Sequence, residues 1–275
     1  MQSLVQASQE GAAASHPLPE ILKPLTAKGV IPERGQMQMW VAPANGGKSL
    51  LSMFYAVQAH VPTMVFSADT DRRTTQYRSV AMATGHRIED VKGMYGTSAE
   101  DIVAEAERDI TDAGVLFDFN PNPELEDIDL EIQAYETVWG EPPALVVIDN
   151  LINLQTGDAG DFSALIDSLA FLHGLARTKD CAVIVLHHVN ERDGQHATEY
   201  PAPRNAIRGR VAQYPEVILS LAMVPDQGLM RIAVVKHRHA TPSPNGEEYV
   251  TVYVNPETGR FYGTAAELQR DKEWA

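Results

Sequence analysis

The chain has 275 residues, with 22 lysines and arginines against 37 aspartates and glutamates, and a formal net charge of −15. Apolar residues make up 44% and charged residues 21%, which is ordinary globular usage and excludes a wholly disordered chain. No apolar run reaches about 18 residues, so no membrane-spanning helix is predicted. The acidic balance argues against a protein that coats duplex DNA through a general positive field.

The first residues and the cysteine content predict a cytoplasmic location. Residues 1–14 are polar and rich in alanine and glycine, without the basic and apolar regions of a secretory signal. Cys181 is the only cysteine, so the chain cannot form an internal disulfide, which suits a reducing compartment.

Strand-like and helix-like segments alternate along the chain after a tail and an irregular lead-in with one short helix. Strands are expected at 36–41, 63–67, 115–119, 144–148 and 181–186, and helices at 49–59, 72–83, 98–112, 125–138 and 161–177. Ser98 is the expected N-cap of its helix. Residues 190–205 are polar and aperiodic, as in a functional or mobile loop. Three strand-like runs follow, at 217–223, 230–236 and 249–254. This alternation predicts an α/β fold with a mostly parallel sheet and terminal antiparallel strands.

The segment from Val41 to Ser49, with the sequence VAPANGGKS, is similar to a phosphate-binding loop between a strand and a helix. Backbone N–H groups at the helix start would cradle phosphates, Lys48 would reach the β- and γ-phosphates, and the Ser49 hydroxyl would bind Mg²⁺. The expected nucleotide contacts are Ala42, Pro43, Ala44, Asn45, Gly46, Gly47, Lys48 and Ser49.

One position departs from the phosphate-loop pattern. Ala42 stands where the first glycine belongs, so we expect a slightly different backbone there, because glycine has access to positive φ. The alternative interpretation of the whole segment is a glycine-rich turn before a helix, with Lys48 solvated.

Two carboxylates are expected at the same edge of the sheet. Asp149 ends the apolar strand ALVVI and is expected to hold Mg²⁺ together with Ser49, or else to cap the next turn. Asp69 follows the strand TMVFS and is expected to orient or deprotonate the attacking water. The alternative role for Asp69 is that of a helix N-cap, for which Asp71 also qualifies.

These motifs and their order resemble the RecA-like ATPase core of hexameric DnaB-type helicases, and especially small plasmid RepA-like helicases and phage-encoded RecA-like ATPases. The resemblance implies a RecA-like P-loop fold, with a core at 32–263 between a lead-in at 1–31 and a tail at 264–275. It also implies ATP and Mg²⁺ as cofactors. The family usually carries Glu where Asp69 stands, so the shorter side chain puts the placement of the water in question.

The resemblance extends to the strand end Leu186-His187-His188. In the family a Gln or His at this place senses the γ-phosphate, which implies that role for His188. The alternatives are a pair of solvated histidines or a metal site. Neighbouring residues on a strand point to opposite faces, which argues against one metal ion bound by both histidines.

Basic motifs in the last third of the chain imply an oligomer. Arg208 and Arg210 resemble a family segment that follows the DNA-facing loop, and Lys236 and Arg238 are similar to its Lys-x-Arg finger. In the family such cations act on the γ-phosphate of the neighbouring subunit, so the resemblance implies a homo-oligomeric ring or filament. The alternative for each motif is a solvated basic turn.

The loop at 190–205 corresponds to the family's central-channel loop. Arg192 and Arg204 are candidates for contacts with the backbone of single-stranded DNA, although Glu191, Asp193 and Glu199 mean that the loop is not a basic patch.

The expected function is that of a Mg-ATP-dependent ATPase and DNA motor, by resemblance a DNA helicase, that acts on single-stranded DNA in replication or recombination. Three alternatives remain open. One is a recombination mediator that does not unwind DNA, and another is a nucleotide-switched scaffold that binds no DNA. The third is a metal-dependent nuclease that uses Asp69, Asp149, His187 and His188.

Overall fold

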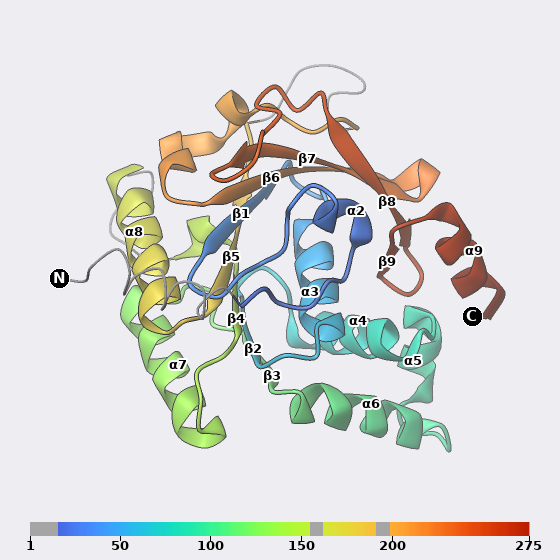
Figure 1. Ribbon diagram of the computed structural model, residues 1–275. Coiled ribbons are helices and arrows are strands. Elements are labelled where there is room, and N and C mark those ends of the chain that lie inside the picture. The colour runs from blue at the N-terminus through green and yellow to red at the C-terminus, as the bar shows by residue number, and fades with distance from the viewer. Residues whose placement is uncertain (1–15, 155–161, 191–198, 275) are drawn as a thin grey trace.

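The computed structural model describes residues 16–154, 162–190 and 199–274. These residues form one nine-stranded sheet with the strand order β3-β2-β4-β5-β1-β6-β7-β8-β9 and helices on both faces (Figure 1). The strands are β1 Met37–Ala42, β2 Thr63–Ser67, β3 Val115–Asp118, β4 Leu145–Asp149, β5 Ala182–His188, β6 Val217–Val224, β7 Leu229–His237, β8 Tyr249–Asn255 and β9 Arg260–Tyr262.

The helices lie mainly between the parallel strands. The α-helices are α2 Lys23–Thr26, α3 Lys48–Gln58, α4 Arg72–Thr84, α5 Ile88–Met94, α6 Glu100–Asp112, α7 Leu125–Trp139, α8 Phe162–Thr178 and α9 Ala265–Trp274. Short 3₁₀ turns are η1 Leu151–Asn153, η2 Arg204–Ala206, η3 Arg208–Gln213 and η4 Pro225–Gln227. No helix among the described residues is both long and apolar enough to cross a bilayer.

The pairing of neighbouring strands changes once across the sheet, from parallel to antiparallel. From β3 to β6 all neighbouring strands pair in parallel, and from β6 to β9 they pair antiparallel. The phosphate-loop strand β1 lies between β5 and β6, with Met37 opposite Val183 and Ala42 opposite His188. The carboxyl ends of β1, β2, β4 and β5 therefore meet at one edge, where open α/β sheets bind ligands. This confirms the expected α/β fold with terminal antiparallel strands.

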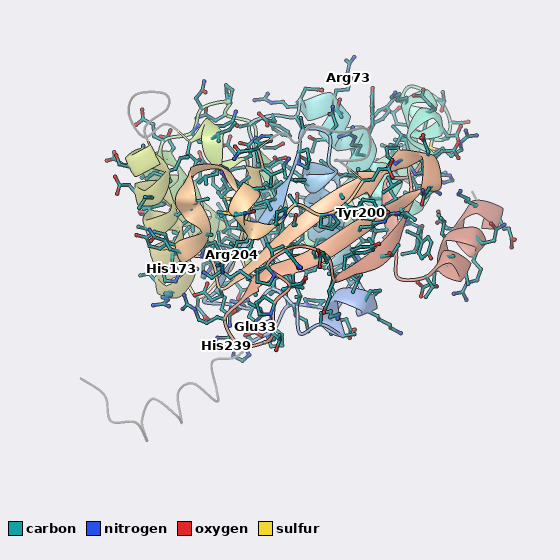
Figure 2. All side chains as sticks on the ribbon, turned by 90° about the horizontal axis from the view of Figure 1, so that it is seen from above. Glu33, Arg73, His173, Tyr200, Arg204 and His239 are labelled. Carbon is teal, nitrogen blue, oxygen red and sulfur yellow. The ribbon has the colours of Figure 1, made fainter. Side chains whose placement is uncertain are left out.

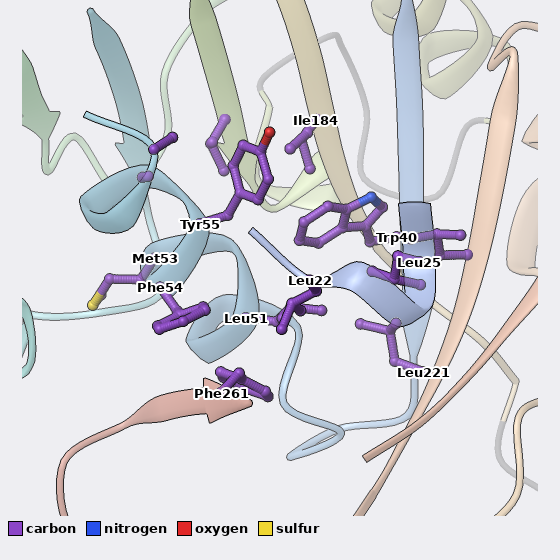
Figure 3. Close-up of a cluster of buried hydrophobic side chains, with 14 of the residues drawn as sticks. Leu22, Leu25, Trp40, Leu51, Met53, Phe54, Tyr55, Ile184, Leu221 and Phe261 are labelled. Carbon is purple, nitrogen blue, oxygen red and sulfur yellow. The ribbon is translucent and has the colours of Figure 1, made fainter. Parts of the chain in front are cut away.

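Both faces of the inner parallel strands β1, β2, β4 and β5 are buried, which explains their apolar runs. Alternate residues of β1 and β5 belong to different core clusters: Trp40 and Ile184 face α3, whereas Met39 and Val183 face α7 and α8. Figure 3 shows the first cluster, in which Leu51 and Phe54 of α3 pack near Trp40 and Phe261 of β9.

The lead-in before β1 belongs to the same core. Leu18, Leu22 and Leu25 are buried in the cluster beneath α3, and the Tyr55 hydroxyl donates a hydrogen bond of 2.8 Å to the carbonyl of Pro19. The segment at 16–31 is thus packed against the sheet, while the proposed domain boundary at residue 32 stays a prediction.

Most expected elements are present within one or two residues of the predicted bounds, and β2 has the bounds expected. The predicted N-cap at Ser98 is wrong. Helix α6 starts at Glu100 with Ala99 as its N-cap, and the hydroxyl of Thr97 accepts a hydrogen bond from the Ala99 N–H. Helix α5, strand β9 and helix α9 were not expected from the sequence; α9 lies in the segment expected as a tail.

Candidate nucleotide-binding site

A cleft of about 450 Å³ opens at the carboxyl ends of the parallel strands. Its walls come from the loop after β1, the start of α3, the ends of β2, β4 and β5, and one residue of α4. The lining residues are Ala44, Asn45, Gly46, Gly47, Lys48, Ser49, Leu50, Asp69, Thr70, Arg78, Asp149, Asn150, His188 and Met223.

The loop after β1 has the backbone expected of an anion cradle. Gly47 is the N-cap of α3 in the left-handed conformation, with φ of 82°, and no side chain caps the helix start. A Cβ on Gly47 would lie 2.5 Å from the Met230 Cε and 2.6 Å from the Met223 Cε. The positive φ favours glycine here, a side chain would displace the two methionine ends, and the first N–H groups of α3 are left to an anion.

The structure corrects our expectation that Ala42 has an unusual backbone conformation. Ala42 is the last residue of β1 and is fully buried, and the positive φ values of this loop fall on Asn45 and Gly47. A Cβ on Gly46 would lie 2.5 Å from the Cβ of Ala42. Gly46 therefore has no room for a side chain beside Ala42, and Ala42 itself has no positive φ.

Lys48 is held inside the cleft and is not solvated. It is 6% exposed, and its ammonium group donates hydrogen bonds to the carbonyls of Ala42 (3.2 Å) and Pro43 (3.0 Å). Burial lowers the pKa of Lys48, while the carboxylates of Asp149 and Asp69 act in the opposite direction. A phosphate group in the cleft would relieve the cost of this buried charge.

Asp149 is the last residue of β4 and is 5% exposed. Burial raises the pKa of its carboxyl group to about 6, and Asp69 adds to the rise, whereas a hydrogen bond from Ser49 and the charge of Lys48 oppose it. A hydroxyl and a carboxylate side by side are the oxygen ligands that Mg²⁺ prefers, so Ser49 and Asp149 fit the expected magnesium site.

Asp69 lies at the edge of the cleft just after β2, and its side chain is exposed. Its two carboxylate oxygens accept hydrogen bonds from the side-chain amides of Asn150 and Asn153. The N-cap of α4 is Asp71, which accepts a hydrogen bond from the Thr74 N–H. The capping role that we considered for Asp69 thus belongs to Asp71.

The two histidines at the end of β5 lie on opposite faces of the sheet. His188 lines the cleft, and its Nε2 lies 3.5 Å from the amide nitrogen of Asn150. His187 is fully buried and is not part of the cleft lining. Over residues 16–154, 162–190 and 199–274, no three His, Cys, Asp or Glu side chains come together as a metal site, and His187 lies apart from the other three residues of the nuclease alternative.

Sequence reasoning missed several residues of the cleft. Arg78 reaches it from α4, and Asn150, Thr70, Leu50 and Met223 complete the lining. The spacing of α4 shows which residues share a face with Arg78, but not which face turns toward the phosphate loop. That orientation depends on how α4 packs with α5 and α6.

The predicted finger residues, Lys236 and Arg238, lie at the edge of the sheet opposite the strand ends that form the cleft. The ammonium group of Lys236 donates to the carbonyls of Ala212, Gln213 and Pro215 at 2.6–3.0 Å, and burial lowers its pKa. Arg238 forms an ion pair of 3.4 Å with the buried Glu216, which also accepts a hydrogen bond from the N–H of Met37 at the start of β1.

The remaining basic candidates are less fully described. Arg204 is exposed at the start of η2, and Figure 2 shows it well apart from Arg73 of α4. Arg208 begins η3, but its side chain and that of Arg210 lie outside the description, as does Arg192.

Comparison with protein families decides the class of this site. A family model described as an AAA domain matches residues 5–194, which is more than half of the chain. The chain belongs to this AAA domain family. Members of the family carry a P-loop ATPase domain, in agreement with the cleft built around Lys48, Ser49 and Asp149.

Curated relatives of this AAA domain protein come from bacteriophages. It is 32% identical over 249 residues to the Gene 65 protein of Mycobacterium phage L5, covering 87% of this chain and 90% of the relative. It is 33% identical over 225 residues to the Gene 65 protein of Mycobacterium phage D29, covering 78% and 94%.

Solved structures with the same fold include an ATPase domain, a helicase and a recombinase. The ATPase domain matches with a TM-score of 0.75 and 16% identity over 95% of this chain and 97% of that one. A DnaB-like replicative helicase matches with a TM-score of 0.77 and 17% identity over 95% and 67% of the chains. The RadB recombinase matches with a TM-score of 0.59 and 16% identity over 90% and 99%. At such identities the likeness shows the fold alone, and that fold is RecA-like and α/β.

Proposed function

We propose that this AAA domain protein is a Mg-ATP-dependent motor of the RecA/DnaB-like class that acts on single-stranded DNA in replication or recombination. The observation that carries the proposal is one cleft that gathers a phosphate loop, a buried lysine, a Ser–Asp pair for Mg²⁺, a second carboxylate and a histidine. This is the set of groups that nucleoside triphosphate hydrolysis requires.

Each group has a task that its position supports. The N–H groups at the start of α3 and the ammonium group of Lys48 bind the phosphates. Ser49 and Asp149 hold Mg²⁺, which supplies charge neutralisation at the phosphates. Asp69 orients the attacking water and accepts its proton, and His188 contacts the γ-phosphate from the end of β5.

In the hexameric helicases that the sequence resembles, a cation from a neighbouring subunit completes the site. Lys236 and Arg238 lie at the far edge of the sheet and therefore do not serve the cleft of their own chain. We propose that in a homo-oligomer Arg238, together with Arg208, stabilises the γ-phosphate of the next subunit. The three carbonyl contacts of Lys236 would have to break for it to act there, so Arg238 is the better candidate.

A strand-displacement assay on a forked DNA substrate with ATP and Mg²⁺ tests the DNA part of the proposal. We expect the wild-type protein to separate the strands and the Lys48→Ala variant to be inactive, because its phosphate loop lacks the ammonium group. ATP-dependent binding of single strands without separation would replace the motor with a recombination mediator. DNA cleavage that needs Mg²⁺ but no nucleotide would contradict the proposal and favour a nuclease.

A further inference from the structure

The side chain of Asp69 needs help to stay in place. It is exposed at a strand end, so nothing in the core restrains the rotation of its carboxyl group. A loosely held water-activating group costs rate, since a misplacement of about 1 Å can slow a reaction by on the order of 10²-fold.

Two asparagine amides hold both oxygens of this carboxylate. Asn150 donates to the Asp69 Oδ2, and Asn153 donates to Oδ1 at 3.0 Å. A swapped amide would place oxygen against oxygen, so the orientation of each amide is fixed by the carboxylate. Both asparagines belong to the short segment that follows Asp149 at the end of β4.

The two amides are themselves held differently. Asn150 is 2% exposed, and its Oδ1 accepts a hydrogen bond of 3.1 Å from the Ile152 N–H, which leaves its amide nitrogen between Asp69 and His188. The Oδ1 of Asn153 is buried and accepts no hydrogen bond from the described residues. Among the described residues, the hydrogen bond of the Asn153 side chain is thus the one to Asp69. The orientation of the Asn153 amide is therefore set by Asp69 and not by a second polar partner.

We infer that Asn150 and Asn153 are positioning residues that orient Asp69 toward the attacking water, and that Asn150 links Asp69 to His188. The segment from Asp149 to Asn153 would then serve both halves of the site: its first residue holds Mg²⁺, and its two asparagines hold the water-activating carboxylate. The amide of Asn150 would transmit the contact of a γ-phosphate with His188 to the carboxylate of Asp69. This inference rests on the proposed ATPase function.

An isosteric substitution separates positioning from packing. Asn153→Asp keeps the size and shape of the side chain but replaces the amide donor with a carboxylate that repels Asp69. We expect turnover to fall at least about tenfold, while the affinity for a fluorescent ATP analogue changes by less than about threefold. Asn153→Gln keeps the amide donor and is expected to retain more turnover than Asn153→Asp. Asn122→Ala, in an exposed loop away from the cleft, is the control and is expected to match the wild type.

The outcomes are distinct. Wild-type turnover in Asn153→Asp would overturn the inference and leave the ATPase function intact, as would an equal loss of turnover and nucleotide affinity. Absence of ATP hydrolysis by the wild-type protein would overturn the proposed function and the inference with it. Asn150→Asp is a second test, because it keeps an oxygen for the Ile152 N–H and replaces the amide donor with a carboxylate oxygen that repels Asp69. It is expected to lose turnover in the same way.

Discussion

Burial changes the pKa of the carboxyl group of Asp149. Its carboxyl group has a pKa of about 6, raised mainly by burial, so it is partly protonated just below neutral pH. A protonated carboxyl group cannot hold Mg²⁺, and metal affinity falls with the ionised fraction.

We therefore expect Mg²⁺-dependent nucleotide affinity to be about tenfold weaker at pH 5 than at pH 7.5. Titration with a fluorescent ATP analogue, with Mg²⁺ and with EDTA at each pH, measures this difference. In Asp149→Asn the pH dependence should vanish together with the Mg²⁺ effect. A wild-type Mg²⁺ effect that stays constant between pH 5 and 7.5 would show that Asp149 is not the group involved.

Arg78 is the cation of the cleft that only the structure revealed. It lines the cleft from α4, and no hydrogen bond or ion pair is recorded for its side chain within the described ranges. A guanidinium group so placed can donate to phosphate oxygens.

We expect Arg78→Ala to lower kcat/KM for ATP hydrolysis by about tenfold or more, because a phosphate would lose a charged donor. Arg73→Ala is the matched control, since Arg73 lies on the same helix, is exposed at the outer edge of the molecule and is not part of the cleft (Figure 2). Equal kinetics for the two variants would remove Arg78 from the site.

The side chain and backbone of Glu216 connect four secondary-structure elements. Its buried carboxylate accepts a hydrogen bond from Met37 of β1, contacts His173 of α8 at 3.1 Å and pairs with Arg238 after β7, while Glu216 itself precedes β6. Truncating this group leaves a buried N–H and nearby cations without their partner.

Glu216→Ala is therefore expected to lower the free energy of unfolding by about 3 kcal/mol in urea denaturation. Glu257→Ala is the control, because Glu257 pairs with Arg87 at the surface and such pairs contribute less than about 1 kcal/mol. Similar destabilisation by both substitutions would contradict this account of Glu216.

The sequence predicted the elements whose apolar pattern is strong and missed those held by tertiary contacts. The strand at 63–67 and the helix at 125–138 are continuous or periodic in apolar residues. In contrast, α9 has Leu268 as its buried apolar residue, and its attachment comes from Asp271, which bonds to Asn255 and Arg260. Such polar contacts between distant segments leave no local pattern.

In the candidate site, too, some residues could be predicted from the sequence and others depend on tertiary packing. The phosphate loop, Asp69, Asp149 and His188 lie at or just after strand ends, so the sequence predicted that they meet, and the structure places them in one cleft. Arg78 and Asn153 depend on the orientation of α4 and on the turn after β4, which spacing alone does not give. The catalytic roles of all these residues stay predictions.

The negative charge of the molecule is concentrated in one part of the chain. Residues 99–141, which include α6, β3 and α7, contain fourteen acidic residues and one basic residue, Arg108. Strand β3 is an edge of the sheet, at the far end from the antiparallel strands that carry Lys236 (Figure 1). DNA is repelled from the acidic end, so its contacts should be confined to a few cations elsewhere.

A shallow salt dependence follows from so few contacts. We expect the logarithm of the single-stranded DNA binding constant to fall against the logarithm of salt concentration with a slope of about −2, the value for roughly three phosphate contacts. Fluorescence anisotropy over a range of salt concentrations measures this slope. A slope of about −6 or steeper would indicate an extended basic track and contradict the expectation.

The most direct test of the central claim is the rate of ATP hydrolysis with and without single-stranded DNA, measured on samples whose assembly size is followed by light scattering. An oligomeric DNA motor predicts turnover that single-stranded DNA stimulates and an assembly larger than one chain when ATP is present. Hydrolysis at the same rate with and without DNA, by a protein that stays monomeric, would contradict the claim.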